Sequence, residues 1–266
     1  MRDIVVIRGA GDLATGVAYR LHRCGFRVLM LDLEAPLVIR RTVSFAQAIY
    51  DGEIDIEGVK GRRVNDLNSI VKAWDNNEIP IVIDEKGEYI KIIRPKIVVD
   101  AILAKKNLGT NKNMADIVIA LGPGFEAGID VDAVIETQRG HYLGKVITEG
   151  PAIADTGIPG NIGGFSKERV IHAPSSGYIE HRAKISDIVR KDDIIALIDD
   201  TPVKASIDGV LRGLINKGLY IKKGLKIADI DPRDVQDHCF SISDKARSIA
   251  GGVLEAIIYF LNNEEN

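Results

Sequence analysis

The sequence predicts an α/β protein, with a parallel sheet covered by helices, then a small all-β domain and a C-terminal helix. Three observations predict this arrangement. An apolar strand runs through a glycine turn into a helix in the segment IVVIRGAGDLATG at 4–16. Two segments between 173 and 231 repeat one another, and residues 243–261 have the periodicity of an amphipathic helix. The predicted domain boundaries are 1–168, 169–232 and 233–266.

The glycine turn has the pattern Gly-x-Gly-x-x-Ala, with Gly9, Gly11 and Ala14. Glycine lets the backbone approach a pyrophosphate, whose charge is stabilised by the amides at the N-terminus of the next helix. A second strand over 26–31 ends in Asp32, where a dinucleotide-binding fold places the acid that holds a ribose hydroxyl. The pattern favours a Rossmann-like sheet; the alternative is a tightly packed turn that binds nothing. The predicted cofactor-binding residues here are Gly9, Gly11, Asp12 and Asp32.

Two adjacent arginines, Arg40 and Arg41, follow the second strand. On the ligand side of the sheet a guanidinium can hold a phosphate with two hydrogen bonds. The alternative is a solvated surface pair. Thr42 and Ser44 supply further donors next to them, which favours the binding interpretation.

Apolar strands at 79–83, 97–99 and 117–121 bring the predicted parallel set to about five. The last of them runs into Gly122 and Gly124. Loops at the carboxyl ends of parallel strands lie on the edge where open α/β sheets bind ligands. Two glycine loops on one edge predict one shared crevice, so Gly122 and Gly124 join the predicted cofactor-binding set.

The segment ETQRGH at 136–141 places a carboxylate, a guanidinium and an imidazole close together. Arg139 and His141 are therefore the candidate catalytic residues, as an anion clamp with a group that titrates near neutral pH. A polar strand end whose charges satisfy one another explains the segment equally well.

Composition limits the classes of partner. The 266 residues include 35 basic and 38 acidic side chains, for a net charge of -3, so neither nucleic acid nor membrane binding is expected. Only two cysteines, Cys24 and Cys239, occur, and no apolar run is long enough to span a bilayer. We therefore expect a cytoplasmic protein. No cluster has the spacing of a metal site, so no metal is predicted.

The repeat aligns 173–199 with 205–231 at an offset of 32 residues, matching Gly177 to Gly209 and Asp199 to Asp231. Two copies of a short-stranded unit can bury their apolar faces against each other. They resemble the barrel-sandwich domains of biotinyl and lipoyl carriers. The join at 199–204 has no methionine and its lysine lies past the tip, so no biotin or lipoate attachment is expected. The apolar C-terminal helix favours a homo-oligomer.

Several segments together resemble the selenium-dependent molybdenum hydroxylase accessory family (YqeB type). The segments are IRGAGDLATGVAYRL, IRRTVSFAQAIYDG, LGPGFEAG, IETQRGH, TGIPG, GVLRGLI and ISDKARSIAGGVLEAI. The resemblance implies a role in maturing or supplying the molybdenum cofactor of such a hydroxylase, which would be the client. It does not imply a settled reaction.

Three hypotheses follow. The first is an accessory protein that binds a nucleotide or a molybdopterin dinucleotide, with Arg139 and His141 orienting the pterin or phosphate. The second is an NAD(P)-dependent oxidoreductase with His141 as proton donor, although no Tyr-x-x-x-Lys pattern accompanies it. The third is a non-catalytic binding or assembly module, in which the β repeat and C-terminal helix form a dimer or dock the client and the Rossmann-like half only senses a ligand.

Overall fold

The computed structural model describes residues 3–157 and 160–263, and it divides the chain into two compact units. Unit 1 comprises Met1–Pro36, Ser44–Thr156 and Ile242–Asn266, and unit 2 comprises Leu37–Val43 and Gly157–Ser241. The predicted boundaries at 168/169 and 232/233 cut the chain into consecutive pieces. In the structure the C-terminal helix instead groups with unit 1. Ile158 and Pro159 of the TGIPG motif lie outside the described residues.

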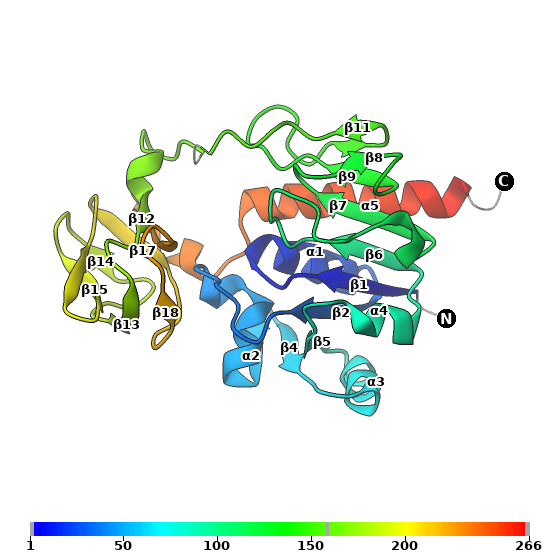
Figure 1. Cartoon of the computed structure of the whole chain (residues 1–266), viewed down its shortest axis with the longest axis horizontal. Helices are drawn as coiled ribbons and strands as arrows, with labels where there is room; N and C mark the ends of the chain where they lie inside the picture. Colours follow the sequence, from blue (N-terminus) through cyan, green and yellow to red (C-terminus); the bar gives the residue numbers. More distant parts are fainter. Residues whose placement is uncertain (1–2, 158–159, 264–266) are drawn as a thin grey trace. The chain divides into compact units, whose positions relative to one another are not determined.

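Unit 1 is built on a nine-stranded sheet with the order β10-β9-β7-β6-β1-β2-β5-β4-β3, and Figure 1 shows β9, β7, β6, β1 and β2 stacked in this order. The strands are β1 (Ile4–Arg8), β2 (Arg27–Asp32), β3 (Glu53–Ile56), β4 (Val59–Arg63), β5 (Ile79–Ile83), β6 (Ile97–Asp100), β7 (Ile117–Leu121), β9 (Ala133–Ile135) and β10 (Val146–Ile147). The inner strands pair in parallel, whereas β3 and β10, at the two edges, are antiparallel to their neighbours. A separate short ladder joins β8 (Glu126–Ala127) and β11 (Gly150–Pro151).

The predicted layout is wrong: the fold is not a Rossmann-like parallel sheet followed by a barrel-sandwich (biotinyl/lipoyl-like) domain and a C-terminal helix. The sheet is mixed, because β3 and β4 form a hairpin at one edge and β10 pairs antiparallel with β9 at the other. Short turns allow antiparallel pairing, whereas parallel strands need a crossover. Between β6 and β7 the crossover contains the 3-10 helix η3 (Lys112–Met114) in place of an α-helix.

Helices cover both faces of the sheet. On one face α1 (Asp12–Arg23) packs beside α5 (Asp244–Asn263), which also contacts β7 and β9. The other face carries α3 (Leu67–Asp75) and α4 (Glu88–Ile93), over a core that includes Val6 and Val98. The remaining helix of unit 1 is the short α2 (Ala48–Asp51), which follows the 3-10 helix η2 (Phe45–Gln47). Alternate side chains of a buried parallel strand face opposite sides, so its sequence reads as a continuous apolar run.

Close backbone contact explains a glycine in the middle of α5. A Cβ atom at Gly252 would lie 2.1 Å from the carbonyl oxygen of Gly144. The loop has little freedom to retreat, because Gly144 has φ +83° and its own Cβ position is 2.7 Å from the Ser248 carbonyl oxygen. Gly252 therefore lets α5 approach the loop that leads into β10.

We expect Gly252→Ala to destabilise the protein by about 1–3 kcal/mol, because the overpacking cost exceeds the gain in helix propensity. The neighbouring glycine supplies a matched control, since a Cβ at Gly251 would meet only the flexible Arg20 side chain, at 3.3 Å. Gly251→Ala should be neutral or stabilising. Urea unfolding midpoints of the two variants measure the difference, and equal midpoints would contradict this account of the contact.

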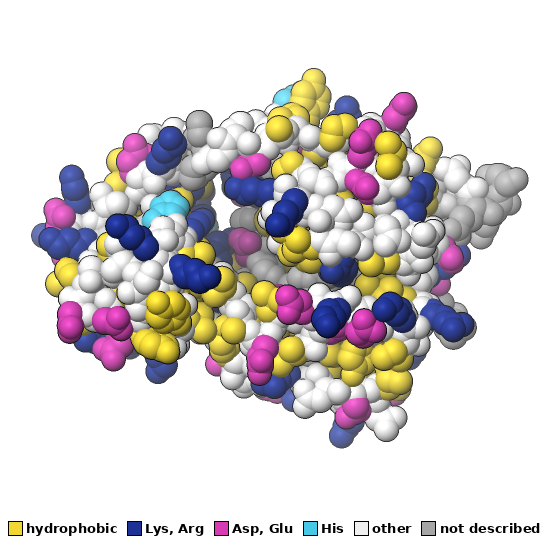
Figure 2. Space-filling view, viewed as in Figure 1, with side chains coloured by type: hydrophobic (Ala, Val, Ile, Leu, Met, Phe, Trp, Pro, Cys, Tyr) yellow, Lys and Arg dark blue, Asp and Glu magenta, His cyan; other side chains and the backbone are white. Residues whose placement is uncertain are grey.

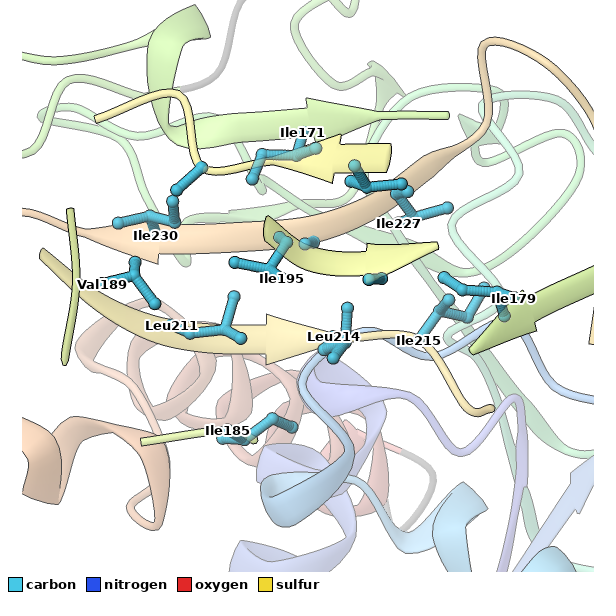
Figure 3. Close-up of a cluster of buried hydrophobic side chains, with 14 of the residues drawn as sticks. Ile171, Ile179, Ile185, Val189, Ile195, Leu211, Leu214, Ile215, Ile227 and Ile230 are labelled. Atoms are coloured by element: carbon cyan, nitrogen blue, oxygen red, sulfur yellow. The ribbon is translucent and has the colours of Figure 1, made fainter. Parts of the chain in front are cut away.

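Unit 2 consists mainly of two four-stranded antiparallel sheets, with the orders β12-β19-β17-β14 and β16-β15-β13-β18. Their strands are β12 (Val170–His172), β13 (Gly177–His181), β14 (Ile188–Val189), β15 (Ile194–Ile198), β16 (Thr201–Lys204), β17 (Gly209–Leu214), β18 (Tyr220–Ile221) and β19 (Lys226–Asp231). The 3-10 helices η1 (Arg41–Val43), η4 (Lys167–Arg169) and η5 (Gln236–Cys239) also belong to this unit. Figure 3 shows isoleucine, leucine and valine side chains from both halves of the repeat in one core.

The repeat in the sequence is also a repeat in the structure. One copy supplies the pair β13 and β15, and the other supplies the pair β17 and β19, 32 residues later. Gly177 and Gly209, which begin β13 and β17, have φ +153° and +147°. The same backbone conformation at matched positions shows that the two halves use the same strand entry.

A buried ionic network lies beside β19. Asp229 accepts hydrogen bonds from Arg169 Nη1 at 3.0 Å and from Arg212 Nε at 2.9 Å. Burial alone would raise the pKa of Asp231, but hydrogen bonds from Arg233 and the charge of Arg212 outweigh it and lower the pKa to about 2. The two aspartates of this strand therefore hold three arginines in place.

In the part of the chain that the structure describes, no helix is both long and apolar enough to cross a membrane.

Candidate functional site

The candidate site lies along the edge of the sheet where the parallel strands of unit 1 end. This edge carries the glycine turn after β1, Asp32 at the end of β2 and the loops that follow β7 and β9. In open α/β sheets such an edge is where ligands bind. We call this edge the carboxyl edge; it comprises the glycine turn after β1, Asp32, and the loops that follow β7 and β9.

The glycine turn is shaped by packing within unit 1. Gly9 has φ +96°, and a Cβ there would lie 2.9 Å from the carbonyl oxygen of Ala101. Gly11 is the N-cap of α1 and makes no side-chain capping hydrogen bond. Since no side chain among the described residues caps α1, the positive end of its dipole faces the carboxyl edge. Gly9 is required by the fold, and Gly11 leaves the helix terminus suited to an anion.

Asp32 lies next to this turn and fixes it. Its Oδ2 accepts a hydrogen bond from the Ala10 amide at 2.7 Å, and its Oδ1 accepts one from the Leu33 amide at 2.8 Å. Burial raises the pKa of Asp32, and these two hydrogen bonds oppose the rise. The carboxyl group therefore supports the backbone of the turn, and its binding of a ribose hydroxyl stays a prediction.

The structure does not place the paired arginines in unit 1. Arg40 is 8% exposed and donates to the carbonyl oxygens of His238 and Ser241, at 2.9 and 3.2 Å. Arg41 donates from Nε to the carbonyl oxygen of Leu214 at 2.6 Å. All of these residues belong to unit 2. The observed contacts are structural ones that tie 37–43 into unit 2, and phosphate binding by these arginines stays a prediction.

The two glycines after β7 are also in close contacts. A Cβ at Gly122, which has φ +72°, would lie 2.5 Å from Thr137 Oγ1. A Cβ at Gly124 would lie 2.7 Å from the Lys106 backbone. The loops after β6, β7 and β9 are thus packed together at the carboxyl edge.

Glu136, which directly follows β9, binds the backbone of two segments with one carboxylate. It is 1% exposed, and it accepts hydrogen bonds from the amides of Gln138 and Ile153 at 2.7 and 2.8 Å. Glu136 therefore fixes the path of the chain on both sides of the site.

Arg139 and His141 have different surroundings. Arg139 forms a bidentate ion pair with Asp244 in the first turn of α5. Its Nη1 and Nη2 atoms each lie 2.8 Å from a carboxylate oxygen of Asp244. His141 is exposed, and its ring packs edge to face against Tyr142, with ring centroids 5.0 Å apart. The structure brings Arg139 to α5 and leaves His141 on the adjacent surface. A catalytic role for either residue stays a prediction.

Lys245 is a candidate that the sequence analysis missed. It lies in the first turn of α5, between Asp244 and Ala246, whose Cβ is 2.8 Å from the Cβ position of Gly16 in α1. It is half-buried, and within the described ranges 3–157 and 160–263 its amino group makes no hydrogen bond or ion pair. Burial and the charge of Arg139 lower the pKa of Lys245, whereas Asp12, Glu136 and Asp155 raise it. This amine therefore lies near the uncapped start of α1.

A buried charge pair beneath the glycine turn was also missed. Arg8, the residue before Gly9, donates to Thr110 Oγ1, and Thr110 donates to Asp100 Oδ2 at 2.5 Å. Arg8 and Asp100 are 5% and 1% exposed. An arginine at the end of an otherwise apolar strand was the sequence signal for this pair. Lys245 had no such signal, because only the fold brings α5 beside α1.

The arrangement is suited to an anionic group. Helix α1 supplies a positive terminus and Lys245 supplies a cation beside it, whereas the charge of Arg139 is balanced by its ion pair with Asp244. Among the residues that the structure describes, no group of three or more metal-binding side chains is present.

Comparisons with known proteins give one strong similarity. The chain is 50% identical over 260 residues to a protein of Escherichia coli (strain K12) named "Uncharacterized protein YqeB". The aligned region covers 98% of this chain and 48% of that protein. The chain thus spans about half the length of the curated relative it matches. This similarity supports the YqeB-type resemblance. No protein-family model matches the chain.

Solved structures give only remote similarities. An aspartoacylase family protein from Mesorhizobium loti is 9% identical, with 86% of this chain and 84% of that chain covered and a TM-score of 0.26. A succinylglutamate desuccinylase/aspartoacylase from Rhodobacter sphaeroides is 8% identical, with coverages of 86% and 85% and the same TM-score of 0.26. Scores this low carry no argument about the fold or function of this chain.

Proposed function

We propose that this protein is an accessory factor that helps to mature or supply the molybdenum cofactor of a selenium-dependent molybdenum hydroxylase. In this role it binds a nucleotide or a molybdopterin dinucleotide at the carboxyl edge of unit 1. The resemblance of the sequence supports the hydroxylase connection, and the similarity to YqeB supports the resemblance. The site supports the binding step.

One observation carries the binding step. Lys245 lies at the carboxyl edge near the uncapped start of α1, and it makes no ion pair with any residue in the described part of the chain. A half-buried ammonium group without a fixed partner can form charge-assisted hydrogen bonds to a phosphate. The amides at a helix N-terminus supply further donors for the same group.

The residues fit one part of a dinucleotide better than the others. The phosphate would be held by the start of α1 and by Lys245, with Arg139 close to α5. Asp32 uses both carboxylate oxygens to support Ala10 and Leu33, so a ribose would share them with the backbone. When bound, the cofactor itself would supply the metal, and the residues of this chain would bind and orient it.

Titration calorimetry distinguishes this proposal from its main alternative. We expect the protein to bind a molybdopterin species more tightly than it binds NAD or NADP. Tight binding of NAD(P) with hydride transfer to an aldehyde or ketone would instead favour an oxidoreductase. The link to a client is tested separately, by measuring the activity of a molybdenum hydroxylase matured with and without this protein.

Binding should depend on pH in a defined direction. Burial and Arg139 lower the pKa of Lys245 from its ordinary value of 10.5. The ammonium form, which attracts the phosphate, is therefore lost at a lower pH than in an ordinary lysine. We expect ligand affinity to fall as the pH rises through this lowered pKa, and we expect Lys245→Arg to remove the fall because arginine stays charged. An identical alkaline fall in Lys245→Arg would contradict this assignment.

A further inference from the structure

Apart from the carboxyl edge, unit 1 has a basic hollow on the face that carries α4. It has a volume of about 810 Å³ and is open to solvent on one side. This volume falls within the range of roughly 300–1,000 Å³ of sites that bind small molecules. Its walls come from the segment around α4 and from the segment that precedes β7. Figure 2 shows basic, acidic and hydrophobic side chains side by side over the region of α4.

The charge of this hollow is opposite to that of the chain. Its lining contains four basic side chains and one acidic one, although the whole protein has a net charge of -3. The basic residues are Lys86, Lys91, Arg94 and Lys96, and the acidic one is Asp116. Gathering like charges costs free energy unless an anion offsets them.

Two of the basic groups make no hydrogen bond or ion pair with the described residues. Lys91 pairs with Glu88 at 3.2 Å, and Lys96 pairs with Asp116 at 3.7 Å. In contrast, the side chains of Lys86 and Arg94 make no hydrogen bond or ion pair with any residue in the ranges 3–157 and 160–263. They are therefore available to a ligand.

The wall around α4 is held rigidly. The Asp84 carboxylate accepts hydrogen bonds from the amides of Gly87 and Tyr89, at 2.9 and 2.8 Å, and so fixes the start of the helix. At its end Arg94 has a left-handed backbone, with φ +49°, and Pro95 follows it. A wall fixed at both ends holds its basic groups in place before a ligand arrives, which lowers the entropic cost of binding.

The opposite wall is equally ordered. Asn107 Oδ1 accepts hydrogen bonds from the amides of Gly109 and Thr110, and Asn111 Oδ1 accepts one from the Asn113 amide. Asn111 and Asn113 line the hollow with amide groups, and Ile90, Pro95, Met114 and Ala115 give it apolar surface. Basic groups, amides and an apolar surface together are suited to a ligand that carries a charged group on a partly apolar molecule.

We propose that this hollow is a second ligand site, which binds a small molecule with a multiply charged anionic group, either a phosphate or a polycarboxylate. The site is separate from the carboxyl edge in its residues, and the proposal does not depend on the proposed function. Lys86 and Arg94 supply the charges that attract the anion, and the apolar lining contacts the rest of the molecule.

Titration calorimetry at low salt tests this proposal, with inorganic pyrophosphate as one probe and citrate as the other. The measurement is made in the Lys245→Gln background, which weakens the carboxyl-edge site. The test variant adds Lys86→Gln and Arg94→Gln, two exposed positions whose side chains make no hydrogen bond or ion pair with the rest of the described chain. The control variant instead adds Arg23→Gln and Lys72→Gln, which are exposed, lie in the same unit and change the net charge equally.

We expect the control to retain binding of at least one probe and the test variant to bind it roughly tenfold more weakly or worse. Preference for pyrophosphate would identify a phosphorylated ligand, and preference for citrate would identify a polycarboxylate. Equal affinities in test and control variants, or no binding of either probe in the control, would overturn the second site. Neither result bears on the carboxyl edge, which is tested by Lys245→Gln in the otherwise natural chain.

Discussion

Asp229→Ala is expected to lower the free energy of unfolding by about 3–5 kcal/mol, because it removes the central carboxylate of a buried ionic network. Asp229 is 3% exposed and is the acceptor for both Arg169 and Arg212. Arg169 is itself only 5% exposed. Removing one partner of such a pair leaves a buried charge uncompensated, which costs more than the pair contributes when intact.

The effect should be concentrated in unit 2, and the chain allows this to be measured. Its single tryptophan, Trp74, lies in α3 of unit 1. Hydrogen exchange of the amides in β17 and β19 reports unit 2, while Trp74 fluorescence reports unit 1. We expect exchange in these strands to accelerate strongly in Asp229→Ala and the Trp74 transition to shift less.

An exposed aspartate of the same unit supplies the control. Asp200 is exposed and has no hydrogen bond or ion pair with the residues that the structure describes. Asp200→Ala removes the same charge, so its effect on unfolding should be within about 0.5 kcal/mol. If Asp229→Ala and Asp200→Ala had equal effects, the buried network would not stabilise unit 2.

Lys245→Gln is expected to reduce the affinity for a nucleotide-type ligand by roughly ten- to a hundredfold. A hydrogen bond to a charged group contributes about 1.5–3 kcal/mol, and this free energy corresponds to that change in affinity. Glutamine keeps most of the side-chain length and two N–H donors, but it carries no positive charge. Because the lysine makes no ion pair or hydrogen bond within the described chain, the substitution should leave the fold intact.

The affinity of Lys245→Gln is compared with that of Lys72→Gln, an exposed lysine of α3 that changes the net charge equally. Lys72→Gln should bind the ligand as the natural chain does. A similar small loss in both variants would mean that only the overall charge matters and that Lys245 does not contact the ligand. Thermal unfolding of both variants checks that neither has lost its structure.

Local patterns in the sequence predicted most individual elements. The apolar runs at 79–83 and 117–121 are β5 and β7 with the same bounds, and the amphipathic segment 243–261 is α5 within two residues at either end. The 32-residue offset of the repeat is also the offset between the first residues of β13 and β17 and between those of β15 and β19. These signals are local, because burial of a strand or helix face sets the apolar period of its own residues.

The arrangement of these elements was harder to predict. Nothing in the sequence of 37–43 indicates that this loop groups with unit 2. In unit 2 the loop lies against Gly213, where a Cβ atom would be 2.6 Å from Ile39 Cγ2. Paired arginines after a strand have the same sequence pattern whether they bind a phosphate or donate hydrogen bonds to the carbonyl groups of a distant segment. Lys245 was missed for the same reason, since the charged groups around it belong to residues far away in the sequence, such as Asp12 and Glu136.

Native mass spectrometry of the protein purified from its own host tests the central claim most directly, with Lys245→Gln purified in parallel. Released small molecules are then identified from both preparations. We predict that the natural chain retains a molybdopterin or its nucleotide form and that Lys245→Gln retains much less of it. A natural chain that carries no such molecule, or a variant that retains it undiminished, would contradict the account of the carboxyl edge as the cofactor site.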